Sequence, residues 1–167
     1  LASADDLVAL GDRAREIEDL MSVAPAVDAE ADLARVVDGV VDGVEPTHPA
    51  AEFPVAVDDD LVAAVDERVL EPVLENVVEN AVEHNDRERP QVTVTATAPA
   101  GDPESVAITV VDDGPDLPET ERAVLRDGDE GPLEHGSGLG LWAVSWGVTR
   151  MGGELSFADN DPRGTVV

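Results

Sequence analysis

The segment 136–141, with the sequence Gly-Ser-Gly-Leu-Gly-Leu, constrains the fold of this chain more than any other segment. Its three glycines stand at alternate positions and lead into an apolar stretch, residues 141–151, that reads as a helix. Glycine lets the backbone turn tightly and present its N–H groups to an anion, and a helix start adds the positive end of its dipole. The segment indicates a phosphate-binding loop, with an ordinary loop-to-helix turn as the alternative.

A second motif lies in residues 73–84, where the apolar residues follow helical spacing. Asn76, Asn80 and His84 fall one turn apart on a neighbouring stripe of this predicted helix. Asparagine is a mediocre helix former, so a pair at this spacing indicates a role other than helix formation. An amide oxygen can bind Mg²⁺, which takes its other ligands from water and phosphates. A solvated polar edge is the alternative interpretation.

A third motif is the sequence Asp-Asp-Gly-Pro that begins at Asp112. The β-branched run 106–111 before it predicts a strand, so Asp112 stands at the end of that strand. A carboxylate there can accept a hydrogen bond from an exocyclic amine such as that of adenine. The alternative is an Asx turn that ends the strand, a common use of aspartate before glycine.

In this order, the three motifs resemble those of the ATP-binding domain of histidine kinases, in the GHKL ATPase superfamily. Residues 76–84 resemble the asparagine box of that family, residues 112–114 its first glycine box, and residues 136–141 its second. The pair Gly164-Thr165 resembles the Gly-Thr near the base. The resemblance covers roughly residues 27–167.

The resemblance implies ATP and Mg²⁺ as cofactors, and it assigns roles by position. Asn80 would coordinate the metal with support from Asn76, and Asp112 would read the adenine amino group with Thr165 helping through a water. Gly114 would let the backbone pass close to the base, and residues 115–135 would form a lid. The other residues implied to bind the nucleotide are His84, Gly136, Ser137, Gly138, Leu139 and Gly140; no catalytic residue is implied within the chain.

One position separates kinases from hydrolases in this superfamily. The hydrolases carry a glutamate one turn before the metal asparagine, and here that position is Asn76. An amide does not take a proton at neutral pH, and Glu75 and Glu79 point to other faces of the helix. The resemblance therefore favours a kinase over an ATP hydrolase.

Two departures from the family pattern favour a rival, a degenerate domain that acts as a dimerisation or docking scaffold. Asp116 stands where a second glycine is usual, and Glu83 stands where a basic residue often contacts phosphate. Arg87 or Arg89 could supply the missing positive charge.

The phosphoacceptor histidine of the family is missing from the expected place. The three histidines are His48 in a turn, His84 in the asparagine box and His135 in the predicted lid. None stands on an N-terminal helix, so we expect the ATP γ-phosphate to be transferred to a histidine not present in this chain.

The N-terminal 25 residues predict a helix of a different kind. Their apolar residues are spaced three and four apart, as in a coiled-coil seam, and comprise Leu7, Leu10, Ala14, Ile17 and Met21. We interpret residues 1–25 as the end of a dimerisation region, its second helix, and residues 26–167 as the ATP-binding catalytic domain. The expected partners are a second copy of the chain and a response regulator. A helix that packs on its own domain is the alternative.

The composition is strongly acidic, with 38 Asp and Glu against 10 basic residues and a net charge of −28. Self-repulsion destabilises such a chain in dilute buffer, whereas at about 1 M salt the screening length falls to about 3 Å. A lysine-free acidic surface resembles proteins of extreme halophiles, and the resemblance is therefore to a haloarchaeal-type kinase. Binding to nucleic acid is not expected, because phosphate contacts need clustered Lys or Arg.

The cellular context follows from what the composition lacks. Cysteine is absent, which excludes disulfides and thiolate metal sites and fits a cytoplasmic chain, or the cytosolic part of a membrane-anchored protein. The sequence has no apolar run of about 18 residues, so we expect no direct membrane contact.

The order of predicted elements indicates an α+β two-layer sandwich, with helices on one face of a mixed sheet. The resemblance implies the same architecture, the Bergerat-type ATP-binding fold. We predict helices at 28–44, 67–84 and 138–151, and strands at 52–57, 61–65, 91–98, 106–111, 154–158 and 165–167.

Overall fold

The centre of the protein is a five-stranded mixed sheet. The computed structural model describes residues 3–102, 104–119, 121–123 and 137–167, with the backbone alone for residues 6 and 137–139. The strand order is β2-β4-β5-β7-β6; β2 and β4 are parallel and the other neighbours are antiparallel. The strands are β2 (Val55–Val57), β4 (Val92–Thr97), β5 (Ala107–Asp112), β6 (Ala158–Asp159) and β7 (Thr165–Val166).

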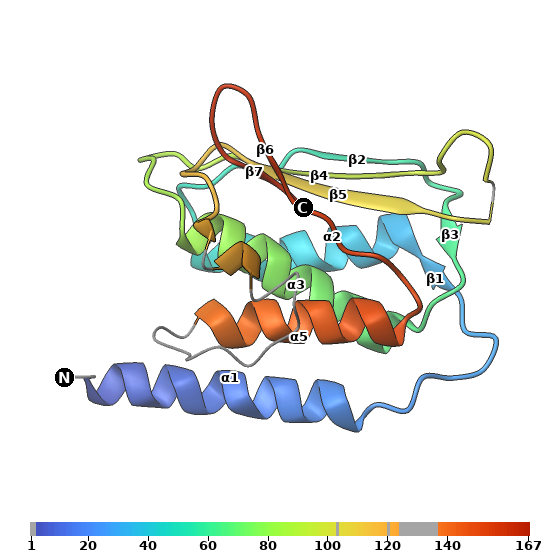
Figure 1. Ribbon diagram of the computed structural model, residues 1–167, viewed down its shortest axis with the longest axis horizontal. Helices are drawn as coiled ribbons and strands as arrows, with labels where there is room; N and C mark the ends of the chain where they lie inside the picture. The colour runs from blue at the N-terminus through green and yellow to red at the C-terminus, as the bar shows by residue number, and fades with distance from the viewer. Residues whose placement is uncertain (1–2, 103, 120, 124–136) are drawn as a thin grey trace.

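Three helices pack against one face of this sheet, as Figure 1 shows, and a fourth lies outside them. The inner helices are α2 (Leu33–Val44), α3 (Glu67–Glu83) and α5 (Ser137–Arg150). The N-terminal helix α1 (Ala4–Ser22) lies against α5 on the side away from the sheet. The predicted α+β sandwich with helices on one face of a mixed sheet is confirmed.

The core forms because the apolar periods of helices and strands meet in one layer. Along β4, alternate residues Val92, Val94 and Ala96 are buried, as expected of a strand with one face on the core. The facing side of α3 is likewise buried and consists mainly of valine and leucine. With almost no aromatic residues available, short branched side chains fill the space between the two layers.

The predicted elements differ from the observed ones in three places. The helix predicted at 28–44 begins only at Leu33, because β1 (Ala31–Asp32) pairs with β3 (Val62–Ala63) in a separate two-stranded sheet. The strand predicted at 61–65 therefore does not join the main sheet. The last hairpin is shifted, since its first strand is Ala158–Asp159 and not 154–158. A short 3₁₀ helix, Glu45–Thr47, follows α2.

Helix α1 packs on its own domain through part of its predicted seam. Ile17 is 7% exposed and Leu20, which lies outside the seam, is 3% exposed. The remaining large seam residues, Leu7, Leu10 and Met21, are 61%, 47% and 45% exposed. The inner face of α1 therefore packs on its own domain, as the alternative interpretation expects. The exposed apolar residues of α1 remain available for contact with another helix. None of the helices within the described ranges has the length and hydrophobicity that a membrane span requires.

The segment after α1 is fixed to the domain by two polar anchors. Arg150 of α5 donates to the carbonyl of Val23 at 3.0 Å and lies over the Trp146 ring. The buried carboxylate of Asp66 accepts the Ala26 N–H at 2.9 Å and is paired with Arg68, which holds its pKa well below the usual range. The same carboxylate accepts the N–H of Arg68 as the N-cap of α3.

Carboxylates gather where α1 meets α3. Glu79 is half-buried, and burial raises its pKa, with repulsion from Glu75 and Glu83 adding to the shift. Burial also raises the pKa of Glu75, and Glu16 of α1 adds to it. Arg13 of α1 opposes this repulsion, since it pairs with Glu83 at 2.8 Å.

Removing these charges is expected to stabilise the domain at neutral pH. A raised pKa in the folded state means that the ionised glutamates destabilise the fold, fully above that pKa and not at all well below about pH 4.5. The double substitution Glu75→Gln and Glu79→Gln should therefore raise the melting temperature at pH 7 by a few degrees, and the gain should vanish as the pH approaches 4.

The matched control is Asp38→Asn, which removes a charge from the exposed side of α2. Calorimetric melting of the variants and the wild type across pH 4 to 8 tests the idea. A gain that is equal for Asp38→Asn, or that does not depend on pH, would contradict it.

Candidate functional site

Helix α3 carries the first predicted site residues on the side facing α5. Asn76 and Asn80 are half-buried, and His84 forms the C-cap of the helix. The Asn76 amide is held in place, because its Nδ2 donates to the carbonyl of Pro72 at 2.9 Å. The Asn76 oxygen is therefore directed away from Pro72, toward the start of α5.

The first turn of α5 comes into contact with these asparagines at a glycine. A Cβ placed on Gly140 would lie 3.1 Å from Asn76 Oδ1 and 3.5 Å from Asn80 Nδ2, so even an alanine there would press on the Asn76 amide. The second predicted glycine motif is thus brought against the asparagine motif. The helix begins at Ser137, one residue earlier than predicted, so Ser137, Gly138, Leu139 and Gly140 belong to its first turn, while Gly136 lies outside the described residues.

Asp112 ends β5 and is 8% exposed. Its Oδ1 accepts the N–H of Gly114 at 2.9 Å. Burial raises the pKa of this carboxyl, while the hydrogen bonds from Gly114 and Thr165 act in the opposite direction. Thr165 is also buried, on the neighbouring strand β7. The sequence predicted that Asp112 ends a strand, and the structure places Thr165 beside it on β7.

The turn after Asp112 is fixed by residues that the sequence reasoning did not assign to the site. Asp113 accepts hydrogen bonds from the Asn85 side chain at 2.9 Å and from the Gln91 N–H at 3.0 Å. Arg87 pairs with the same carboxylate at 3.1 Å. Neither Arg87 nor Arg89, which pairs with Glu52, lines the cavity described below, so neither replaces the missing positive charge there.

The β6–β7 hairpin closes onto the backbone of Asp112. Asn160 donates to the Asp112 carbonyl at 2.9 Å, and the Gly164 N–H donates to Asp116 at 3.1 Å. Gly164 has φ +114°, and a Cβ there would lie 2.0 Å from the Asp112 carbonyl oxygen. Only glycine allows this approach. No motif in the sequence identified Asn160 as a residue of the site.

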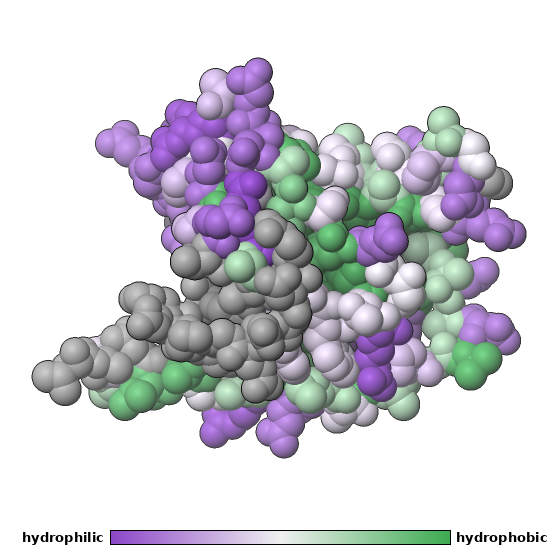
Figure 2. All heavy atoms as spheres, in the orientation of Figure 1, coloured by the Kyte–Doolittle hydropathy of each residue, from purple (hydrophilic) through white to green (hydrophobic). Residues whose placement is uncertain are grey.

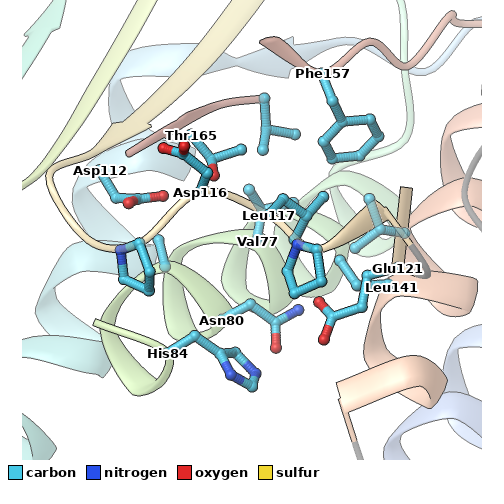
Figure 3. A pocket seen from close by; sticks show the side chains of 15 residues that line it. Val77, Asn80, His84, Asp112, Asp116, Leu117, Glu121, Leu141, Phe157 and Thr165 are labelled. Atoms are coloured by element: carbon cyan, nitrogen blue, oxygen red, sulfur yellow. The ribbon is translucent and has the colours of Figure 1, made fainter. Parts of the chain in front are cut away.

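These elements enclose a cavity of about 190 Å³, shown in Figure 3. Asp112, Asp116 and Thr165 lie at one end in this view, while Asn80, His84 and Glu121 lie at the other. Apolar side chains from α3, from α5 and from Phe157 and Val167 in the C-terminal segment form much of the wall. Such a wall suits a flat ring system such as a nucleobase. The lining residues are Val77, Asn80, Ala81, His84, Asp112, Pro115, Asp116, Leu117, Pro118, Glu121, Leu141, Val144, Phe157, Thr165 and Val167.

One polar group of the cavity lacks a partner that a ligand could supply. Asn80 Nδ2 is buried and has no hydrogen-bond partner among the described residues. An unpartnered buried amide costs about 1–3 kcal/mol, which a ligand can relieve, and rotation of the amide presents its oxygen to a cation. The described residues form no cluster of three or more His, Cys, Asp or Glu side chains suited to a metal, so a cation at Asn80 would take most of its ligands from phosphates and water.

Glu83 stands at the position where a basic residue often contacts phosphate in the family, but it does not line the cavity. Its carboxylate turns to α1 and pairs with Arg13. Its charge therefore serves the contact between α1 and α3. Asp116 does line the cavity, and its carboxylate is held at the wall by the Gly164 N–H.

The comparisons with known proteins agree with this geometry. Residues 65–167, more than half of the chain, match the family described as histidine kinase-, DNA gyrase B-, and HSP90-like ATPase. The chain belongs to this family. A stretch of 69 residues is 41% identical to the sensor histidine kinase DpiB of Escherichia coli K12 and covers 38% of this chain and 12% of that protein. The chain thus spans about an eighth of the length of this curated relative.

Solved structures of sensor kinases share the fold. The mycobacterial sensor histidine kinase MprB is 28% identical, with a TM-score of 0.69 over 84% of this chain and 93% of that one. Full-length ShkA, solved in complex with AMPPNP, is 25% identical, with a TM-score of 0.72 over 97% of this chain and 35% of that one. The chain is the ATP-binding catalytic domain of a sensor histidine kinase.

The close approach of Gly164 to β5 gives a test of how the Asp112 end of the cavity is held together. Gly164→Ala should destabilise the domain by well over the roughly 1–2 kcal/mol of left-handed backbone strain alone, because its Cβ also meets the Asp112 carbonyl. Gly101→Ala is the matched control, since Gly101 has φ +94° but open space around it. Chemical unfolding of both variants measures the difference, and equal losses would refute the role given to Gly164.

Proposed function

We propose that this domain binds Mg²⁺-ATP in the cavity and presents the γ-phosphate to a histidine side chain that lies outside this chain. The observation that carries the proposal is the meeting of Asp112 and the unpartnered Asn80 amide in one cavity. The two residues come from a strand end and a helix, and the fold brings them together without an ion pair or a hydrogen bond between them in the described structure.

The base would lie at the end of the cavity that Asp112 forms. The carboxylate has one oxygen bonded to the Gly114 N–H, and its second oxygen is the acceptor for an exocyclic amine of adenine. Thr165 lies close enough on β7 to share a bridging water. A Cβ at Gly114 would lie 3.1 Å from Asp112 Oδ1 and from the Asn85 side chain, so glycine lets the turn stay close to the Asp112 carboxylate.

The phosphates would lie at the end that Asn80 and the start of α5 form. The residues assigned to them are His84 and the segment 136–140, whose backbone N–H groups and helix start suit an anion. Mg²⁺ would neutralise part of the triphosphate charge. Asn76, held by Pro72, would position Asn80 and Gly140 without binding the metal itself. Catalysis would then rest on positioning and charge neutralisation.

The arrangement around Asn76 supports phosphotransfer over ATP hydrolysis. The Asn76 nitrogen donates to the Pro72 carbonyl, so the residue is engaged as a hydrogen-bond donor and has no basic group to activate water. Glu75 and Glu79 lie beside α1 and not in the cavity. A second candidate function, a docking scaffold without nucleotide, is favoured by the acidic side chains of Asp116 and Glu121 in the lining.

The partners in this proposal are a second copy of the chain and a response regulator. Residues 1–25 would belong to the dimerisation region and residues 26–167 to the catalytic domain. The exposed Leu7, Leu10 and Met21 of α1 supply the apolar surface that a helical dimer needs.

Substitution of Asn80 separates the two candidate functions. Asn80→Ala should weaken Mg²⁺-ATP binding by at least about 100-fold, since it removes the proposed metal ligand, and should leave the domain folded. Glu71→Ala is the matched control, because Glu71 is exposed on the same helix outside the cavity. Isothermal titration calorimetry measures both. Unchanged affinity in folded Asn80→Ala would refute the assignment, and no binding by the wild type would leave the scaffold.

We further propose that the protein works at high salt, as haloarchaeal proteins do. Eight arginines already pair with carboxylates, so most of the acidic residues lack a cationic partner among the described residues; the pairs involve Arg13, Arg15, Arg35, Arg68, Arg87, Arg89, Arg122 and Arg163. Screening by salt would relieve their mutual repulsion.

The melting temperature should therefore rise by about 10 °C or more between 0.1 M and 2 M KCl. Thermal unfolding followed by circular dichroism measures the change. Most of the gain should come below about 1 M, where screening changes most, and a flat profile over this range would contradict the proposal.

A further inference from the structure

Glu121 lines the cavity, and the proposed Mg²⁺-ATP site gives its carboxylate no role. It follows Pro118, whose carbonyl accepts the Glu121 N–H at 3.0 Å, and its side chain is half-buried. In Figure 3 the Glu121 carboxylate is directed toward the Asn80 side chain, next to Leu141. Among the described residues, this carboxylate has no hydrogen-bonding or ionic partner.

The other two carboxylates in the lining are engaged by the protein. Asp112 accepts the Gly114 N–H, and Asp116 accepts the Gly164 N–H. Both lie at the end of the cavity assigned to the base. Glu121 therefore differs from them both in its position, beside Asn80, and in its lack of a partner.

No arginine in the described lining balances the Glu121 charge. Arg122 follows it directly, but its Nε donates to the Leu117 carbonyl at 2.9 Å and its Nη2 pairs with Asp159. The guanidinium is thus held outside the cavity. An anionic phosphate that entered next to Asn80 would face a negative charge that no described residue compensates, in a partly desolvated space.

We propose that Glu121 makes this site selective for the cation-bound nucleotide over the free nucleotide. The inference rests on the proposed role of Asn80 as the metal ligand. Mg²⁺ keeps several of its waters when it binds a protein, and those waters need hydrogen-bond acceptors around them. The Glu121 carboxylate, directed toward Asn80, would be such an acceptor, and the same charge repels a triphosphate that arrives without a cation.

Hydrogen bonding to the waters of the cation and repulsion of the free triphosphate both favour the cation-bound nucleotide. With the cation present, Asn80 would bind it and Glu121 would accept hydrogen bonds from its waters. Without the cation, Glu121 opposes binding while Asp112 still accepts the base. The selectivity therefore appears as a ratio of affinities and not as a loss of nucleotide binding.

The test compares ATP binding with Mg²⁺ and with EDTA at constant ionic strength, by isothermal titration calorimetry. The wild type should bind ATP at least about 100-fold more tightly with Mg²⁺. Glu121→Gln keeps the size of the side chain and removes its charge, and it should reduce this ratio by about tenfold, mainly by tightening the binding of free ATP.

Glu119→Gln is the matched control, because it removes the same charge two residues away at an exposed position outside the lining. Its ratio should stay within about twofold of the wild type. Equal ratios for Glu121→Gln and wild type, or equal changes in both variants, would overturn the proposal.

Failure of the proposed function looks different from failure of this inference. If the folded wild type does not bind Mg²⁺-ATP, the role of Asn80 is refuted and the inference falls with it. If the wild type binds Mg²⁺-ATP and Asn80→Ala does not, but Glu121→Gln retains the wild-type ratio, only the selectivity assigned to Glu121 is refuted. Melting curves of each variant confirm that the titrated protein is folded.

Discussion

The close packing of α3 against α5 is the constraint on which the site depends. Gly147 allows it, because a Cβ there would lie 2.3 Å from Val73 Cγ2. Two turns earlier, Gly140 brings the start of α5 against Asn76 and Asn80. The glycines of α5 therefore place a helix start beside two amides, and a larger residue at Gly147 would clash with Val73 of α3.

The opposite end depends on a similar close approach between strands. Gly164 passes so near the Asp112 carbonyl that no side chain fits, and Asn160 bonds to the same carbonyl. The short β6–β7 hairpin thereby fixes the strand end that carries the Asp112 carboxylate. Both ends of the cavity thus depend on close contacts at glycines, while apolar side chains fill the wall between them.

The arginines near the cavity, Arg87 and Arg122, pair with carboxylates of the protein and do not line the cavity. Figure 2 shows polar side chains gathered on the upper left of the molecule, over the hairpin region, and apolar ones exposed to its right. In a chain of net charge −28, the proposed nucleotide site would take its positive charge from a cation and from backbone N–H groups.

The sequence by itself determined the class of fold, the order of most elements and the three motifs of the site, because helical spacing, strand alternation and glycine chemistry act over short distances. It placed Asn80, Asp112 and Thr165 correctly on their elements. Only the tertiary structure decided that Glu83 turns to Arg13, that β1 and β3 form their own sheet, and that Glu121 faces Asn80. Those outcomes depend on contacts between segments far apart in the chain, which no local pattern encodes.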